Sequence, residues 1–251
     1  MKQLALYDGP FGKVRIIERL CDGARSYSME GGLQTLVDAT GTSLFGYVNA
    51  LKLLLRDRKK VLMLGGGGGS LATMLARKGH SVAVVDIDPM AETIARRFFD
   101  LDPRVRWFTE DGLTFPDRCR VKYDAIVVDA CTGKGTVPAF TRPDWLSGVM
   151  NVCAESGVLM LNLAYNLVNE GSVPIDGFTL ADEMSRLGFH SVLLRPEDGW
   201  EGNELLILSR TRPTVNLRTQ EIVKRPAEAR SYLLSLRAHV KRARACTSRN
   251  A

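Results

Sequence analysis

The sequence predicts an α/β protein: a doubly wound parallel sheet with an antiparallel strand at one edge, preceded by a small N-terminal β-segment. Three observations support this prediction. Apolar strand patterns alternate with helical patterns across residues 60–209, which is typical of a parallel sheet covered on both faces. Five consecutive glycines, residues 65–69, follow a buried strand pattern and allow the backbone to approach a ligand closely. The last two strand patterns are joined by "EDGWEG", which is short enough for an antiparallel hairpin.

Length and composition limit the class of protein. The 251 residues suffice for one large α/β domain with a small appendage. No apolar stretch approaches the roughly 20 residues that span a bilayer, and the N-terminal "MKQLALYDGPFG" becomes polar too early for a secretion signal. We therefore expect a cytoplasmic protein without membrane contact. The five cysteines form no CxxC pair, so we expect neither a disulfide framework nor a metal site.

The first segment, residues 1–42, contains short strand patterns. Three of them are "GKVRIIERL", "ARSYSME" and "LQTLVDA". They are separated by the dipeptides Asp22-Gly23 and Gly31-Gly32, which are typical of turns. We expect a small antiparallel meander.

The second segment, residues 43–209, contains the alternating patterns. Thr42 or Ser43 can cap a helix through "LFGYVNALKLLLRD", in which apolar residues recur on one stripe. The strand patterns that follow are "KVLMLG", "SVAVVDID", "VRWFT", "YDAIVVDA", "GVLMLNLA", "FHSVLLRP" and "NELLILSR". Further helices are predicted through "SLATMLARKG", from residue 89 to 99, and through "IDGFTLADEMSRLG". This order outlines a class I methyltransferase-like, Rossmann-type fold rather than an NAD-binding domain.

The third segment, residues 210–251, is basic. It carries 11 Lys and Arg against two Glu, whereas the rest of the chain carries 23 basic and 26 acidic side chains. The net charge of +6 therefore belongs to this tail, and the body gives no sign of nucleic-acid binding. The stretch "RPAEARSYLLSLRAHVKRARA" predicts one helix with Pro226 in its first turn and Leu233, Leu236 and Val240 on one stripe. We expect this helix to pack on the body or on a partner subunit; a basic arm that contacts nucleic acid is the alternative.

Acidic residues follow three of the predicted strands. Asp86 ends a strand about 20 residues after the glycine run, where an acid can accept hydrogen bonds from ribose hydroxyls. Asp111 in "TEDG" can accept from an adenine amino group, with neighbouring backbone completing the pocket. Asp129 ends "YDAIVVDA", and ligands of open α/β sheets sit outside the carboxyl ends of the strands. The residues expected to bind a nucleoside here are Gly65, Gly66, Gly67, Gly69, Asp86, Asp111 and Gly112.

These motifs together resemble the polyamine aminopropyltransferases, the spermidine synthase family. The resemblance runs from about residue 12 to residue 164 and is strongest in "LDPRVRWFTEDG" and "YDAIVVD". It implies decarboxylated S-adenosylmethionine as co-substrate, an amine as acceptor, no metal, and a homodimer. Gln34 in "EGGLQ" matches the family's nucleoside-binding glutamine, and Tyr47 matches the tyrosine of its Y-H-E stretch. Asp129 matches the aspartate that holds and deprotonates the acceptor amine, so Asp129 and Tyr47 are the predicted catalytic residues.

The implied reaction is chemically coherent. An aliphatic amine has a pKa of about 10 and attacks only when neutral. The leaving group is a neutral thioether that needs no acid, so positioning and proton removal are most of the task.

Three positions depart from the family's pattern. Gly68 stands where the family's glycine loop has an aspartate for the aminopropyl amine, and Thr132 stands where a second aspartate binds the acceptor. Val48 replaces the histidine of Y-H-E, and Lys134 adds positive charge in the acceptor loop. Losing those carboxylates weakens the binding of a dication, so we expect an acceptor other than putrescine.

Three functions stay open at this point. The first is an aminopropyltransferase with a changed acceptor. The second is a methyltransferase that uses S-adenosylmethionine itself, since a pocket without an acid at Gly68 need not exclude the donor's carboxylate. The third is a nucleoside-binding protein without catalysis, acting as a sensor or as an assembly partner through its basic tail.

Overall fold

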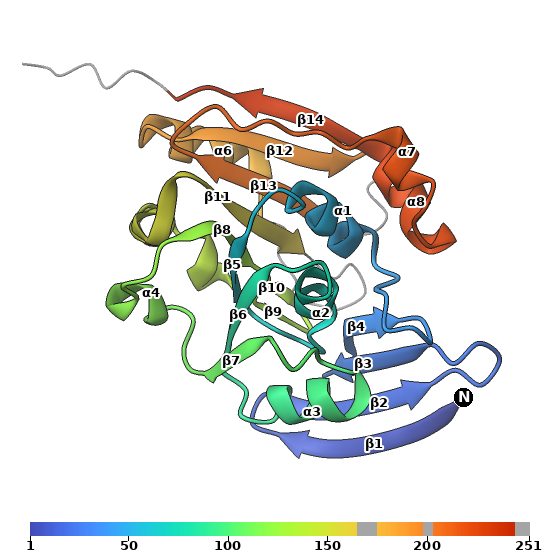
Figure 1. Ribbon diagram of the computed structural model, residues 1–251. Helices are drawn as coiled ribbons and strands as arrows, with labels where there is room; N and C mark the ends of the chain where they lie inside the picture. Colours follow the sequence, from blue (N-terminus) through green and yellow to red (C-terminus); the bar gives the residue numbers. More distant parts are fainter. Residues whose placement is uncertain (165–174, 198–202, 244–251) are drawn as a thin grey trace, which may run out of the picture.

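A large mixed sheet forms the centre of the protein in the computed structural model, which describes residues 1–164, 175–197 and 203–243 (Figure 1). Its strands are β5 (Lys60–Leu64), β6 (Ser81–Asp86), β7 (Arg106–Thr109), β8 (Tyr123–Val128), β11 (Cys153–Ala164), β12 (His190–Pro196), β13 (Asn203–Ser209) and β14 (Leu236–Lys241). They lie in the order β14-β12-β13-β11-β8-β5-β6-β7. The five strands from β11 to β7 pair in parallel. The doubly wound α/β class predicted from the sequence is confirmed.

Antiparallel pairing is confined to the other end of this sheet. β13 runs antiparallel to β11 on one side and to β12 on the other, so the predicted final pair does form an antiparallel pair. β13 is, however, inserted inside the sheet. The antiparallel strand at the edge is β14, which pairs with β12.

The prediction of a single helix in the tail is therefore wrong. The expected single helix is helical only over α8 (Ala227–Ser235), preceded by the short α7 (Thr219–Ile222), and its second half is the strand β14. The physical reason is the open edge of β12. Its N–H and C=O groups gain hydrogen-bond partners when residues 236–241 pair with them as a strand, and further turns of helix would leave them without these partners. Residues 236–241 pair along β12 from Pro196 back to Ser191. The last eight residues of the tail, 244–251, lie outside the described residues.

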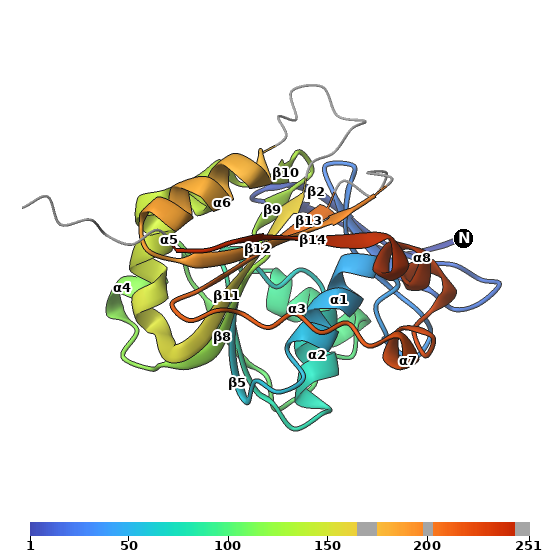
Figure 2. The ribbon, with the colours of Figure 1, turned by 90° about the horizontal axis from the view of Figure 1, so that it is seen from above.

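Helices cover both faces of the sheet, as Figure 2 shows with α5 and α6 on one side and α1, α2 and α8 on the other. The helices are α1 (Gly46–Leu54), α2 (Ser70–Ala76), α3 (Ala91–Phe98), α4 (Phe115–Arg118), α5 (Pro143–Val149) and α6 (Gly177–Arg186), with 3-10 turns η1 (Pro138–Thr141) and η2 (Met150–Val152). Alternate residues of β5 point to the two faces: Val61 and Met63 join one core cluster, and Leu62 and Leu64 the other. This explains why the strand pattern is continuously apolar.

The first helix begins later than predicted. Phe45 occupies its N-cap position, and no side chain caps the helix. The hydroxyl of Ser43 instead accepts a hydrogen bond of 3.2 Å from the N–H of Phe45, and the N–H of Leu44 donates to Leu36 O. The preceding loop is thus held by the N-terminal sheet, which sets the first helical residue at Gly46.

The N-terminal segment is a separate antiparallel sheet. Its strands β1 (Lys2–Gly9), β2 (Gly12–Glu18), β3 (Arg25–Met29) and β4 (Gly32–Val37) lie in the order β1-β2-β3-β4. The meander is confirmed for the last three, whereas β1 was not predicted, because its alternation is broken by a register shift between Gln3 and Ala5. α3 packs on this sheet through Ile94 and Phe98, as Figure 1 shows.

Within the described part of the chain, no helix is long and apolar enough to cross a membrane.

Candidate functional site

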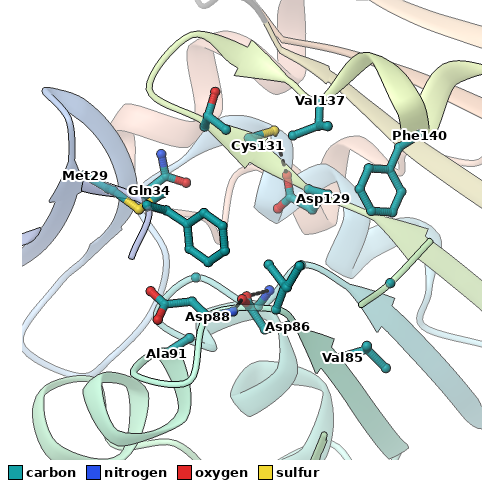
Figure 3. Close-up of a pocket in the computed structure, with 18 of the residues that line it drawn as sticks. Met29, Gln34, Val85, Asp86, Asp88, Ala91, Asp129, Cys131, Val137 and Phe140 are labelled. Atoms are coloured by element: carbon teal, nitrogen blue, oxygen red, sulfur yellow. Dashed lines mark hydrogen bonds between the residues drawn. The ribbon is translucent and has the colours of Figure 1, made fainter. Parts of the chain in front are cut away.

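A cavity of about 290 Å³ lies at the carboxyl ends of β5, β6 and β8, between the central sheet and the N-terminal sheet. Figure 3 shows Asp129 and Cys131 on one side of it, and Asp86 and Asp88 on the other. Eight of the ten predicted site residues line this cavity: Gln34, Gly65, Gly66, Gly67, Asp86, Asp111, Gly112 and Asp129. Gly69 and Tyr47 are not among its lining residues.

The glycine loop is required by close backbone packing. Gly65 has a φ of +94°, and a Cβ there would lie 2.3 Å from the carbonyl oxygen of Asp129. The loop can therefore pass directly beside the end of β8 only with glycine at this position. Gly69, with a φ of +71°, precedes α2 and faces Leu101 rather than the cavity, because a Cβ there would lie 2.7 Å from Leu101 Cδ1. Its role is to start the helix.

Asp86 connects the loop with the end of β6. Its Oδ2 accepts a hydrogen bond of 2.8 Å from the N–H of Gly66, and its Oδ1 accepts one of 2.9 Å from the N–H of Asp88. Burial raises the pKa of Asp86. Each carboxylate oxygen has two lone pairs, so Asp86 can accept a further hydrogen bond from a ligand hydroxyl without losing its place in the loop.

Asp88 is a cavity-lining acid that the list of predicted site residues lacked. Its side chain is 5% exposed, and its Oδ1 accepts from the N–H of Met90 at 2.9 Å, at the start of α3. Its Oδ2 is buried and has no hydrogen-bond partner among the described residues. The sequence signal was its position two residues after Asp86 in "VVDID".

The far end of the cavity suits a flat ring. Asp111 accepts a hydrogen bond of 2.8 Å from the N–H of Leu113 through Oδ1. Phe140 lies against Gly112, since a Cβ on Gly112 would be 3.3 Å from its ring. Trp145 holds this ring edge-on, with centroids 5.0 Å apart. An aromatic face beside an acceptor carboxylate fits an aromatic base that carries an amino group.

Asp129 is held by three side-chain donors: Tyr47, Asn162 and, as a weak thiol donor, Cys131. Its Oδ1 accepts from Asn162 Nδ2 at 2.8 Å, and its Oδ2 accepts from the hydroxyl of Tyr47 at 3.2 Å. Burial raises the pKa of Asp129 and also raises the pKa of Tyr47, so the tyrosine stays a protonated donor at neutral pH. Tyr47 thus supports Asp129 from outside the cavity. We interpret it as a positioning residue rather than as one that contacts a ligand.

Asn162 is a site residue that the sequence analysis missed. It is 1% exposed near the carboxyl end of β11, and its Oδ1 accepts from Asn203 Nδ2 at 2.8 Å. The signal was available, because it is the one polar side chain in the apolar pattern "GVLMLNLA", and a buried amide requires partners.

Cys131 lies beside Asp129, with its Sγ 3.8 Å from Oδ1. Burial, followed by the nearby carboxylate, raises the pKa of Cys131. A thiol held in its protonated form is a poor nucleophile. Cys131 is the first residue of β9 (Cys131–Thr132), which pairs with β10 (Gly135–Thr136), and we interpret it as part of the cavity wall.

Gly68 does not face the cavity. Its N–H donates a hydrogen bond of 2.8 Å to Thr35 Oγ1. A Cβ at this position would lie 2.9 Å from Thr35 Cγ2 and 3.0 Å from the ring of Phe99. The space that an aspartate would need is therefore filled by neighbouring side chains. Of the other departures, Thr132 lines the cavity and Val48 is a core residue, 4% exposed.

The ionisable side chains that line the described cavity include four aspartates and no basic residue. Four carboxylates line it, those of Asp86, Asp88, Asp111 and Asp129, and among the described lining residues there is no Lys, Arg or His. Such a wall attracts a cation and repels an anion.

Comparison with known sequences shows what the chain is similar to. The model of the spermine/spermidine synthase domain matches residues 48–172. An eEF1A lysine and N-terminal methyltransferase homolog of Drosophila pseudoobscura pseudoobscura is 33% identical over 119 residues, which are 42% of this chain and 18% of that protein. A polyamine aminopropyltransferase of Thermoplasma volcanium is 27% identical over 109 residues, which are 41% of this chain and 40% of that protein. The chain thus matches less than half of the length of either relative.

A solved structure shows the same fold over nearly the whole chain. The probable spermidine synthase of Corynebacterium glutamicum superposes with a TM-score of 0.74 at 18% identity, covering 97% of this chain and 92% of that one. The sequence resemblance is therefore confirmed. Residues 48–172 of the chain match the spermine/spermidine synthase domain, the family that the sequence resembles.

Proposed function

We propose that the chain is a transferase that binds decarboxylated S-adenosylmethionine in the cavity and transfers its aminopropyl group to an amine. The observation that carries the proposal is the wall of four carboxylates without a lining cation among the described residues. The decarboxylated donor carries a sulfonium and an ammonium but no carboxylate, which suits this wall. In this proposal Asp86 and Gln34 bind the ribose, and Asp111 accepts from the adenine amino group.

The glycine loop also favours a donor without a carboxylate. Backbone N–H groups are the usual anion ligands of such a loop. Here the N–H of Gly66 donates to Asp86 and that of Gly68 donates to Thr35. These two groups are already satisfied and offer nothing to a donor carboxylate.

Asp129 supplies the proton chemistry. The ammonium of the acceptor binds to its carboxylate and gives up a proton, which leaves the amine nitrogen with a free electron pair. That pair attacks the methylene carbon beside the sulfonium, the new N–C bond forms, and the C–S bond breaks. The bonding electrons move to sulfur, so methylthioadenosine leaves as a neutral thioether. The product nitrogen keeps its proton as a secondary ammonium, since an aliphatic amine has a pKa of about 10, and the proton on Asp129 passes to solvent.

The acceptor in this proposal is an amine other than putrescine. Thr132 lines the cavity where a carboxylate would bind a second ammonium group, and Gly68 is closed off by Thr35 and Phe99. A diamine therefore finds only one acid, Asp129, on the acceptor side of the described cavity.

Methyl transfer from S-adenosylmethionine is the second candidate. It is favoured by Gly68, since no acid at that position opposes the donor's carboxylate, and by the match to a methyltransferase homolog over 42% of this chain. In that case Asp129 binds the nucleophile in the same place.

The deciding experiment is calorimetry of the purified chain with the two donors and with methylthioadenosine, followed by mass spectrometry of amine mixtures incubated with each donor. We expect tighter binding of the decarboxylated donor and a product that has gained an aminopropyl group. Preference for S-adenosylmethionine with methylated products would establish the second candidate. Absence of binding by all three nucleosides would reject both and leave a protein without this catalysis.

A homodimer is a further proposal, drawn from the family resemblance. Light scattering coupled to gel filtration tests it, and a monomer at micromolar concentration would contradict it.

A further inference from the structure

The C-terminal helix reaches the neighbourhood of the site through Tyr232. This residue of α8 is 3% exposed, and its hydroxyl donates a hydrogen bond of 3.1 Å to the carbonyl oxygen of Asn203. Its ring lies directly on the first residue of α1, because a Cβ on Gly46 would be 2.4 Å from Tyr232 Cβ. The next residue of α1 is Tyr47. Figure 1 shows α8 beside α1.

A chain of amides continues from Asn203 to Asp129. Asn203 Nδ2 donates to Asn162 Oδ1 at 2.8 Å, and Asn162 Nδ2 donates to Asp129 Oδ1 at 2.8 Å. A side-chain amide has a donor end and an acceptor end, and the two differ only in orientation. Asn203 occupies the acceptor end of Asn162, so the donor end must face Asp129. In the reversed orientation, the amide oxygen would face the carboxylate and repel it.

Tyr232 contacts this chain of amides at Asn203, the end opposite Asp129. Its hydrogen bond fixes the backbone of Asn203 at the beginning of β13, and its ring fixes the beginning of α1, which carries the second donor to Asp129, Tyr47. The two stronger donors of Asp129, Asn162 and Tyr47, are thus supported by elements that Tyr232 contacts, whereas the weak thiol donor Cys131 is not.

We propose that Asn203 and Tyr232 are positioning residues for Asp129, and that α8 is part of the catalytic machinery. The kinetic consequence rests on the proposed transferase function, whereas the effect on the titration of Asp129 does not. A donor to a carboxylate stabilises its ionised form. Loss of the orienting contact therefore raises the pKa of Asp129 and reduces the fraction of enzyme with a usable base.

The test uses the full chain with Asn203→Ala and Tyr232→Phe. We expect Asn203→Ala to raise the pKa of Asp129 by about one unit, the shift that corresponds to one hydrogen bond to a charged group. It should reduce kcat about tenfold at pH values below the pKa of Asp129, with the KM of the donor unchanged within a factor of two. Tyr232→Phe should act in the same direction with a smaller effect. The carboxyl carbon resonance of Asp129, assigned by its disappearance in Asp129→Asn, reports the pKa without any turnover.

Matched variants separate this role from a general loss of packing. Tyr123→Phe removes another buried tyrosine hydroxyl, from a residue 2% exposed on β8, and should leave the titration of Asp129 unchanged. Gly46→Ala should displace Tyr232 and raise the pKa of Asp129. Gly148→Ala should not, since a Cβ there has no atom within 4 Å. Tyr232→Phe and Gly46→Ala keep the test available if Asn203→Ala does not fold.

The outcomes are distinct. An Asp129 titration identical to that of the wild type in Asn203→Ala and Tyr232→Phe would overturn the proposal. A raised pKa in these variants, in a wild-type chain that transfers no group from either donor, would reject the proposed function and leave the positioning role intact.

Discussion

The hydroxyl of Tyr47 lies 3.2 Å from Asp129 Oδ2 and donates a hydrogen bond to it, although 82 positions separate the two residues in the chain. Tyr47 comes from α1, on one face of the sheet, and Asp129 follows the central strand β8. With Asn162 and, more weakly, Cys131 on the other oxygen, the carboxylate is held by three donors and presents its remaining lone pairs to the cavity.

The first prediction concerns the base itself. Asp129→Asn should retain the binding of methylthioadenosine within about threefold and lose turnover by about 10²–10⁴-fold, the usual contribution of a general base. Tyr47→Phe should cost about tenfold in kcat, since it removes one supporting hydrogen bond. Calorimetry and initial rates on the same preparations measure both. Full activity in Asp129→Asn would remove this residue from the mechanism.

The second prediction concerns pH. Burial raises the pKa of Asp129 in the folded protein above the value of about 3.9 for an exposed aspartate. Its protonated form favours the fold, so this contribution to stability is complete below the unfolded pKa and is lost as the pH rises through the folded pKa. Replacing the residue by Asn removes that loss. The free energy of unfolding of Asp129→Asn, relative to the wild type, should therefore increase from pH 4 to pH 8.

Chemical denaturation at several pH values measures this difference. Parallel pH dependences of the two proteins would show that Asp129 titrates in the fold as it does in the unfolded chain. For the wild-type enzyme, kcat should fall on the acid side as the pH drops through the raised pKa of Asp129.

The third prediction concerns the ribose. Asp86→Ala removes the acceptor for two backbone donors and for the nucleoside, and we expect methylthioadenosine to bind about 100-fold more weakly, as for the loss of a charged hydrogen-bond acceptor. Asp57→Ala is the control, because that side chain is 85% exposed. Unchanged affinity in Asp86→Ala would place the ribose elsewhere.

The fourth prediction concerns Gly68. Gly68→Asp introduces a Cβ at 2.9 Å from Thr35 Cγ2, and such overpacking costs about 1–3 kcal/mol. We expect a lower free energy of unfolding and no gain in putrescine turnover. Gly148→Asp, placed where a Cβ meets nothing within 4 Å, should change the stability by less than about 0.5 kcal/mol. Efficient putrescine use by Gly68→Asp would show that the loop accommodates the acid after all.

The fifth prediction tests the docking of α8. Leu233 is 2% exposed and its neighbour Leu234 is 56% exposed, so the two offer a matched pair in one helix. Leu233→Ala should cost about 2–5 kcal/mol in the free energy of unfolding, and Leu234→Ala less than about 0.5 kcal/mol. Equal effects of the two substitutions would mean that α8 does not pack on the body in solution.

The acidic residues of the cavity could be predicted because their positions at strand ends are local in sequence. Each strand of a parallel sheet ends at the same edge, so Asp86, Asp111 and Asp129 were brought to one place by the alternation of strands and helices alone. The same reasoning could not place Tyr47 behind Asp129, because α1 reaches the site only through its packing on the sheet.

The tail shows where local pattern fails. Its apolar spacing fits a helix as far as Ser235, but residues 236–241 gain more from the open edge of β12 than from a further helical turn. The choice between helix and strand depends on β12, which lies about 45 positions earlier in the sequence. A short sequence window around residues 236–241 does not include β12.

By itself, the sequence determined the α/β class, the edge of the sheet at which the acidic residues gather and the resemblance to the aminopropyltransferases, because periodicity and strand-end acids act over short distances. Only the tertiary structure decided that Gly68 is enclosed by Thr35 and Phe99, and that Asn162, Asn203 and Tyr232 stand behind Asp129. Those contacts join residues 29 to 41 positions apart along different elements. They depend on how helices and strands pack around one buried carboxylate, and the pattern of a single segment does not predict that packing.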